Sequence, residues 1–122
     1  MSDHENAWPK ELRVSPDRKM LTIRYADERS YSIEAELLRV RSPSAEVQGH
    51  SPAQRVTVGG KADVTISKVL PVGNYAVRLA FDDGHDSGIF TWSFLSELGE
   101  TKDENWADYI AELAGKGMSR TL

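Results

Sequence analysis

Short stretches in which apolar and polar residues alternate constrain this chain more than any other feature. In the clearest stretch, residues 76–81, Val77, Leu79 and Phe81 alternate with alanine or arginine. Residues 21–25 show the same period of two. This period predicts β-strands that bury one face. Weaker patterns predict further strands at residues 11–14, 31–33, 55–58, 64–67 and 87–90.

Turn-forming residues separate these strands and favour antiparallel neighbours. Asp82-Asp83-Gly84 joins the strands at 76–81 and 87–90, and glycine tolerates the positive φ that a hairpin turn requires. Turn compositions also occur at residues 15–18, 26–29 and 71–74. The strands within residues 11–33 are therefore predicted to form a small antiparallel meander.

Three segments carry helical patterns. Good helix formers at residues 34–40 predict one or two turns of helix. Apolar residues at helical spacing predict a second helix over 92–98, and Thr101-Lys102-Asp103-Glu104 is typical of the capping box that begins a third. The third helix carries one apolar stripe, formed by Trp106, Tyr109, Ile110 and Leu113.

The sequence therefore predicts an α+β fold, with a small, twisted, mostly antiparallel β-sheet, a short internal helix and two C-terminal helices. We expect residues 1–10 to form a flexible lead-in, 11–99 the folded domain, 100–117 a C-terminal amphipathic helix and 118–122 a frayed tail. Between the predicted strands, Arg41–Gln54 is rich in proline and serine, which predicts a long irregular loop.

Composition narrows the classes of function. A chain of 122 residues without cysteine has the usual size of one domain, cannot form disulfides or cysteine metal clusters, and suits a reducing compartment. The first residues are polar, and no apolar run approaches the ~20 residues that span a bilayer, so we expect a cytoplasmic protein without a membrane partner. A net charge of −4 argues against a nucleic-acid partner.

Several motifs together resemble those of a known family. They are residues 37–47 (LLRVRSPSAEV) with Gly49 and His50, residues 71–78 (PVGNYAVR), residues 81–90 (FDDGHDSGIF), Trp92, and Glu97-Leu98-Gly99. The chain resembles the gamma-butyrobetaine hydroxylase-like N-terminal domain family, a bacterial domain of unknown function, from about Trp8 to Gly99.

This resemblance implies a fold that recurs beside unrelated catalytic domains. The family includes stand-alone bacterial proteins, domains that precede the catalytic barrel of gamma-butyrobetaine and trimethyllysine hydroxylases, and domains joined to P-loop ATPases that carry iron–sulfur clusters. In the joined cases the chemistry belongs to the other domain.

The resemblance also implies a vestigial zinc site. The hydroxylase domains are expected to bind zinc through Cys-x-Cys-x-x-Cys and a later histidine, and these positions map onto Ser42, Ser44, Val47 and His85. Serine hydroxyls stay protonated near neutral pH and are poor zinc ligands, and valine offers no ligand. No cofactor is therefore expected.

Weak metal candidates remain in His85, His50, Asp83 and Asp86, whose residue types bind divalent metals. The alternative is that these residues serve a hairpin turn, in which Asp and Gly are common. Asp86-Ser87-Gly88 also matches a short protease signature but lacks its apolar flank, and Gly59-Gly60-Lys61 lacks the upstream glycine and the Ser/Thr of a phosphate-binding loop. No enzymatic activity is expected.

The implied zinc positions suggest that two distant segments meet. A candidate interaction junction joins the loop from residue 41 with the turn at 82–87, and its members are Arg41, Ser42, Ser44, Glu46, His50, Asp82 and His85. The junction is either a structural replacement for zinc or a surface for a partner. We expect a non-catalytic interaction or adaptor module with a protein partner; the alternative is an accessory factor in iron–sulfur or metal handling. The sequence leaves the oligomeric state open.

Overall fold

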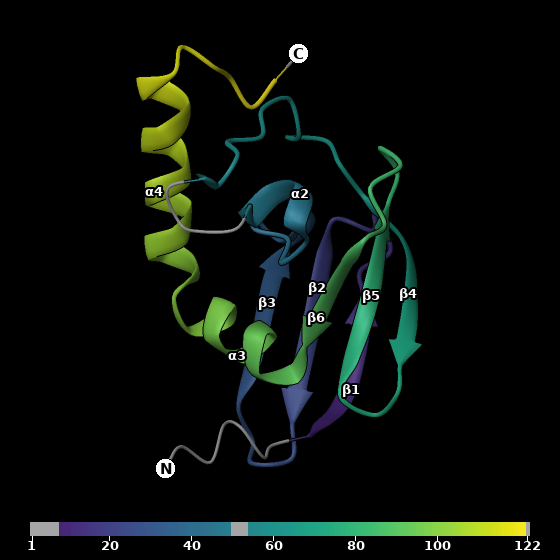
Figure 1. The fold of residues 1–122 in the computed structure, drawn as a ribbon. Helices are drawn as coiled ribbons and strands as arrows, with labels where there is room; N and C mark the ends of the chain where they lie inside the picture. Colours follow the sequence, from purple (N-terminus) through teal and green to yellow (C-terminus); the bar gives the residue numbers. More distant parts are fainter. Residues whose placement is uncertain (1–7, 50–53, 122) are drawn as a thin grey trace.

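The computed structural model describes residues 8–49 and 54–121. Its helices and strands form an α+β fold, which confirms the predicted class (Figure 1). In chain order they are β1 (Pro9–Val14), β2 (Met20–Tyr25), β3 (Ser30–Glu34), α1 (Ala35–Val40), α2 (Ala45–Gln48), β4 (Ile66–Val72), β5 (Ala76–Phe81), β6 (Gly88–Thr91), α3 (Trp92–Glu100) and α4 (Lys102–Gly115).

The strands form two antiparallel sheets of three strands each, ordered β1-β2-β3 and β4-β5-β6. The sequence predicted one sheet, because alternation identifies a strand but not the sheet to which it belongs. In the first sheet Leu21 pairs with Ile33 and Ile23 with Tyr31, so their side chains share one face. Both isoleucines and Leu21 are fully buried.

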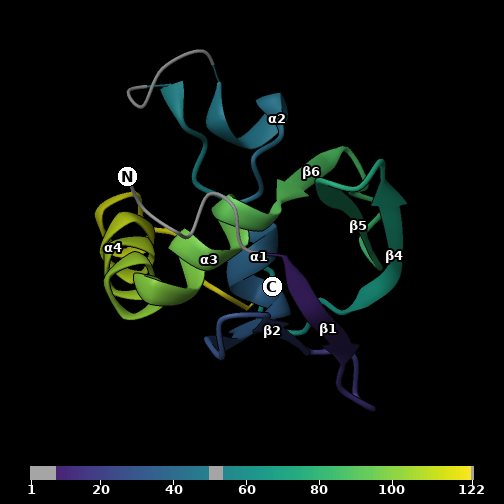
Figure 2. The same ribbon diagram turned by 90° about the horizontal axis from the view of Figure 1, so that it is seen from below.

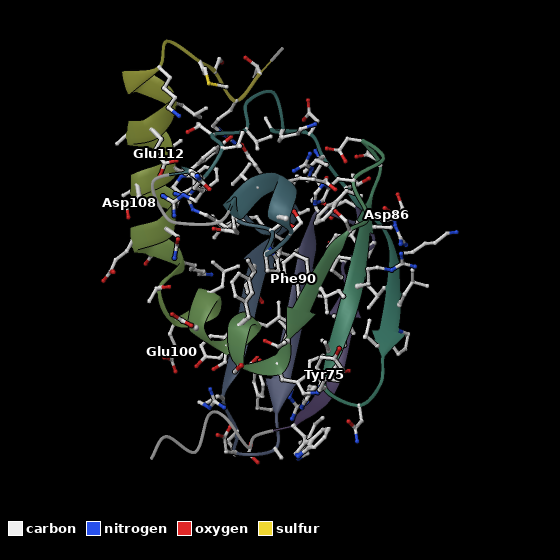
Figure 3. All side chains as sticks on the ribbon, in the orientation of Figure 1. Tyr75, Asp86, Phe90, Glu100, Asp108 and Glu112 are labelled. Atoms are coloured by element: carbon white, nitrogen blue, oxygen red, sulfur yellow. The ribbon has the colours of Figure 1, made fainter. Side chains whose placement is uncertain are left out.

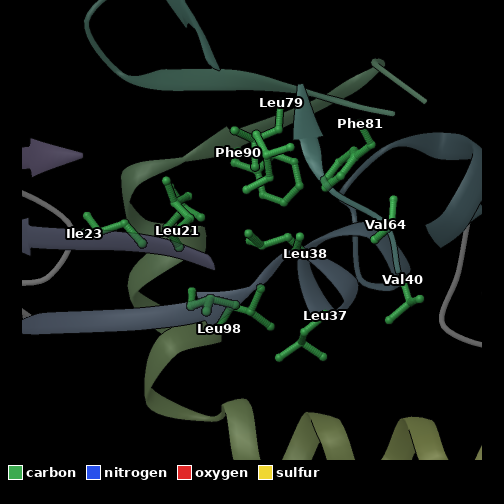
Figure 4. Close-up of a cluster of buried hydrophobic side chains, with 14 of the residues drawn as sticks. Leu21, Ile23, Leu37, Leu38, Val40, Val64, Leu79, Phe81, Phe90 and Leu98 are labelled. Carbon is green, nitrogen blue, oxygen red and sulfur yellow. The ribbon is translucent and has the colours of Figure 1, made fainter. Parts of the chain in front are cut away.

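The hydrophobic core lies between the two sheets and α1 (Figure 4). The first sheet contributes Leu21 and Ile23, the second contributes Leu79, Phe81 and Phe90, and α1 contributes Leu37, Leu38 and Val40. Arg18 ties the sheets together outside this core, because its guanidinium donates to the carbonyls of Ile66 and Ser67. The two sheets therefore belong to one folded unit.

The helices cover the side of the core away from β4. Seen from below, α4 lies on one side of the molecule and the second sheet on the other, with α1 and α3 between them (Figure 2). Thr91 caps α3, because its hydroxyl accepts a hydrogen bond from Phe94 N at 3.1 Å. On the face of the second sheet that points away from this core, Lys68, Arg78 and Ile89 are exposed.

Three local predictions were wrong. Thr101 does not cap α4; its hydroxyl instead donates to the carbonyl of Glu97 at 2.8 Å, because α4 follows directly on α3. Residues 55–58 form no strand, and the loop predicted after Arg41 contains the short helix α2.

The tail also departs from expectation over residues 118–121. Gly60 N donates to the carbonyl of Ser119, Ala62 N donates to that of Arg120, and Arg120 forms two hydrogen bonds with the buried Glu36. A frayed tail was predicted because it is terminal and follows the two glycines that end the last helix, Gly115 and Gly117; residues 118–121 are instead held by contacts with distant residues. Among the described residues, no helix is long and apolar enough to cross a membrane.

Candidate functional site

His85 lies between the hairpin turn and β6, and the turn holds it in place. Gly84 has a φ of +91°, the positive value that the turn requires. The turn closes with a hydrogen bond from Phe81 N to the carbonyl of His85 at 2.9 Å, and His85 N donates to the Asp83 carboxylate at 3.0 Å. The sequence of the turn therefore fixes the position of the imidazole.

The segment between α1 and α2 brings two serines to this imidazole. The Nε2 atom of His85 lies 3.1 Å from Ser42 Oγ and 3.3 Å from Ser44 Oγ. Ser42 Oγ also donates to Ser44 Oγ at 3.3 Å. Ser42 is fully buried, and Ser44 and the neighbouring Val47 are nearly so. The two serine hydroxyls therefore find their hydrogen-bond partners inside the protein rather than in water.

An acidic side chain occupies the other edge of the imidazole. Nδ1 of His85 lies 3.2 Å from Glu46 Oε2, and the second carboxylate oxygen of Glu46 accepts from Ser87 Oγ at 2.8 Å. These contacts assign the Nδ1–H as the donor to Glu46 and leave Nε2 as the acceptor of one hydroxyl hydrogen from the Ser42–Ser44 pair. Burial lowers the pKa of His85, and the positive charge of Arg39 lowers it further, so the ring is neutral at pH 7.

Glycine at position 88 makes this close approach possible. A Cβ atom at Gly88 would lie 2.3 Å from Ser42 Oγ and 3.0 Å from an edge carbon of Phe90. Since real Cβ atoms do not approach so closely, any larger residue would displace Ser42 from the imidazole. Gly88 is a member of this junction that the sequence did not indicate.

Several predicted members of the junction lie elsewhere. The Arg41 side chain contacts Glu112 on α4, and Asp82 accepts from Thr65 N at 3.0 Å. Asp86, a weak metal candidate rather than a junction member, is exposed at one end of β5 and β6, opposite Tyr75 at the other end (Figure 3). His50 lies outside the described residues.

Asp83 is engaged by cations. Arg39 Nε and Lys61 Nζ lie 2.7 and 2.6 Å from its Oδ2. Burial alone would raise the pKa of Asp83, but hydrogen bonds from Lys61, the His85 N–H and Arg39 lower it to about 2. Its carboxylate balances these cations and closes the turn.

The residues present do not fit a zinc site. Among residues 8–49 and 54–121, no three His, Cys, Asp or Glu side chains are grouped closely enough to hold a metal. The imidazole nitrogen nearest the serines already accepts hydrogen bonds, and neutral hydroxyls are weak zinc ligands. The cluster of Ser42, Ser44, Glu46 and His85, hereafter the serine–histidine junction, is therefore held by hydrogen bonds.

Ser42, His85 and Glu46 are arranged like the members of a catalytic triad: one imidazole nitrogen faces a hydroxyl and the other faces a carboxylate. A nucleophile must also reach its substrate. Ser42 has 0% exposure and lies against Gly88, while the orienting Glu46 is 66% exposed to solvent. This geometry suits the joining of two segments rather than acyl transfer.

A second polar cluster, which no sequence motif indicated, lies around Glu112. Glu112 of α4 accepts hydrogen bonds from Arg41, Arg55 and Thr57, and Arg41 is only 3% exposed. A signal was available in the sequence: Glu112 lies three residues after Tyr109 and one before Leu113, both in the apolar stripe of α4, so it must border the buried face. An acid at that position requires a cationic partner.

A family model and several solved structures are similar to this chain. The family described as "Gamma-butyrobetaine hydroxylase-like, N-terminal" matches residues 12–96. One solved protein, studied by NMR in solution, is 52% identical with a TM-score of 0.80, and the match covers 93% of this chain and 90% of that one. Another NMR structure is 38% identical with a TM-score of 0.83, covering 98% and 89% of the two chains.

A crystal structure extends the comparison. It shows a protein of unknown function from Acidithiobacillus ferrooxidans that belongs to the DUF971 family. That protein is 36% identical with a TM-score of 0.63, and the match covers 80% of this chain and 98% of that one. No curated protein matches the chain.

Proposed function

The chain belongs to the gamma-butyrobetaine hydroxylase-like, N-terminal family, and from this premise we propose that it is a non-catalytic interaction module acting on a partner protein. The observation that carries the proposal is an outer sheet face on which the exposed Ile89 and the half-buried Leu70 lie beside two exposed cations, Lys68 and Arg78. The serine–histidine junction has a different role in this proposal: it joins the α1–α2 segment to the β5–β6 turn, as a hydrogen-bonded replacement for zinc.

This face is the outer face of β4, β5 and β6. Strand register places Leu70, Arg78 and Ile89 side by side in one row, and Lys68 beside Ala80 in the next. Ile89 is 43% exposed. The inner face of the same sheet is buried in the core. These five residues are hereafter the outer sheet face.

The charges of the outer sheet face indicate the chemistry of the partner. Both of its charged residues are exposed cations: Arg78 lies between Leu70 and Ile89 in one row, and Lys68 lies in the next. A partner segment with apolar side chains and adjacent acids would bury Ile89 and pair with the two cations. We propose such an acidic, amphipathic segment of another protein as the ligand of this face.

Photocrosslinking in the source cell tests the proposal. A photoreactive phenylalanine analogue at position 89 should give one discrete protein adduct, and Arg78→Glu in the same chain should abolish it. The matched control carries the analogue at Ile110, an exposed apolar residue on α4. No adduct from position 89, or equal adducts from both positions, would overturn the proposal. Unchanged thermal melting of each variant shows that the fold is intact.

The alternative in iron–sulfur or metal handling has no supporting observation in the described part of the chain. The proposed module needs no cofactor and acts on protein rather than nucleic acid. A cytoplasmic location is part of the proposal and rests on the composition of the sequence. Cell fractionation followed by immunodetection would test that location.

A further inference from the structure

A cavity of about 180 Å³ lies between helices α3 and α4 and the segment that follows α1. It is separate from both the serine–histidine junction and the outer sheet face. Its lining residues are Arg41, Gln48, Arg55, Phe94, Glu97, Leu98, Thr101 and Asn105. Ligand sites for drug-sized molecules have volumes of roughly 300–1,000 Å³, so this cavity suits a smaller molecule.

One wall of the cavity is cationic. Arg41 is buried and donates to the Glu112 carboxylate from both terminal nitrogens, at 3.3 and 2.8 Å. Arg55 Nη2 donates to the same carboxylate at 2.7 Å. Two guanidinium groups thus share one acid, Glu112, which leaves this wall of the cavity with an excess positive charge. Burial alone would raise the pKa of Glu112, but Arg41 and Arg55 hold it below its usual value.

The amides in the wall are already satisfied. Gln48 Nε2 donates to the carbonyls of Arg41 and Ser42, and Asn105 Nδ2 donates to the carbonyl and hydroxyl of Thr101. Recognition of a ligand anion therefore falls to the arginines. Arg55 is the more available of the two, since one third of its side chain is exposed.

The opposite wall belongs to α3 and is partly apolar. Phe94 and Leu98 are four residues apart and lie on one side of the helix, where they line the cavity. Glu97 lies between them in sequence and adds an acid to the same wall. A small ligand would contact apolar carbon on one side and guanidinium on the other, with the Glu97 carboxylate opposing an anion.

We propose that this cavity binds a small carboxylate with a short apolar body. The carboxylate pairs with Arg55, beside the Arg41–Glu112 pair, and the hydrocarbon lies against Phe94 and Leu98. A guanidinium favours a carboxylate because it offers two parallel N–H donors. This site is independent of the proposed interaction function, since it uses none of the outer sheet face.

An NMR titration of the ¹⁵N-labelled chain with pentanoate tests the proposal, with pentanamide as the neutral analogue. Pentanoate should shift amide signals of α3 and of the residues around Arg55 in a saturable manner, and pentanamide should bind at least about tenfold more weakly. Equal affinities for pentanoate and pentanamide would show that the carboxylate charge makes no contribution to binding and would overturn the proposal.

Two variants and a control locate the site. Arg55→Gln should weaken pentanoate binding by about tenfold or more, whereas Glu97→Gln should strengthen it, because an opposing charge is removed. Arg78→Gln, which removes a cation from the outer sheet face, should leave affinity unchanged. Non-saturable shifts, or equal losses in Arg55→Gln and Arg78→Gln, would contradict the proposal. Circular dichroism of each variant checks that folding is retained.

Discussion

At the scale of single residues, one imidazole connects two segments more than forty positions apart. His85 accepts a hydroxyl hydrogen from the Ser42–Ser44 pair on one edge and donates to Glu46 on the other, and its three contacts with these side chains lie at 3.1–3.3 Å. Buried polar groups stabilise a fold only when they are paired, and removal of one partner leaves the other unsatisfied. Loss of His85 should therefore weaken the serine–histidine junction, even though Glu46 is its only charged member.

His85→Ala should destabilise the protein. The substitution removes the shared partner of Ser42 and Ser44 and opens space beneath the turn, which we expect to lower the free energy of unfolding by about 2 kcal/mol. Urea denaturation measures the change. Asp86→Ala, one residue along on the exposed turn, is the control and should stay within about 0.5 kcal/mol of the original protein. Equal effects of the two variants would refute a structural role for His85.

The same residue should make stability depend on pH. The pKa of folded His85 lies below its ordinary 6.5, because burial and Arg39 outweigh the opposing effects of Glu46 and Asp83. The unfolded chain therefore binds the proton more readily, so stability is greatest above about pH 7 and falls as the pH drops through 6.5 toward the folded pKa.

Urea midpoints between pH 7.5 and 5.5 measure this dependence. His85→Asn should show a shallower decline than the original chain, since it lacks the titrating ring. His4 and His50 are present in both chains, so their contributions cancel in the comparison. Identical slopes would show that His85 does not titrate differently in the folded and unfolded chains.

At the scale of elements, an ion-pair cluster fastens α4 to the rest of the molecule. Glu112 lies on the side of α4 that faces the α1–α2 segment (Figure 3), and Arg41, at the C-terminal end of α1, donates to it. Tyr109, one turn earlier on the same face, is buried and donates to the carbonyl of Val58 at 2.6 Å. The helix thus combines apolar packing with a buried charge.

Glu112→Gln should weaken the docking of α4. It leaves Arg41 buried without its counter-charge, and loss of one member of a buried ion pair costs roughly 3 kcal/mol. Thermal melting followed by circular dichroism measures the loss. Glu104→Gln is the matched control, because Glu104 is exposed on the first turn of the same helix. A melting temperature that falls equally in both variants would argue against the cluster.

At the scale of the whole molecule, the two sheets share one core. The hydroxyl of Tyr25 in the first sheet donates to the carbonyl of Trp92 at 2.7 Å, and Trp92 Nε1 donates to the carbonyl of Asn74 at the β4–β5 turn. Side chains from both sheets and from α1, α3 and α4 belong to one buried cluster. No part of this core can be exposed without disturbing the others.

Unfolding should therefore be a single cooperative transition. A Trp8→Phe, Trp106→Phe chain reports on Trp92 beside the second sheet, and a Trp8→Phe, Trp92→Phe chain reports on Trp106 in α4. For each chain, the urea midpoint of tryptophan fluorescence should coincide with that of far-ultraviolet circular dichroism. An earlier midpoint for the Trp106 signal would mean that α4 unfolds separately.

The local sequence determined most of the elements and the membership of the family. Alternation at 21–25 and 76–81 identified strands, because a period of two places one face in the core whatever the sheet. Asp82-Asp83-Gly84 predicted its turn, since a positive φ at Gly84 needs no distant contact. The resemblance also pointed to Ser42, Ser44 and His85 as neighbours, which no local pattern could have done.

The tertiary structure alone decided how these elements combine. The division of the strands into two sheets, the docking of residues 118–121, and the pairing of Glu112 with Arg41 and Arg55 all depend on residues far apart in the chain. The position of Gly88 against Ser42 is of the same kind. Periodicity and turn chemistry act over a few residues, whereas these contacts depend on which surfaces meet when the core closes.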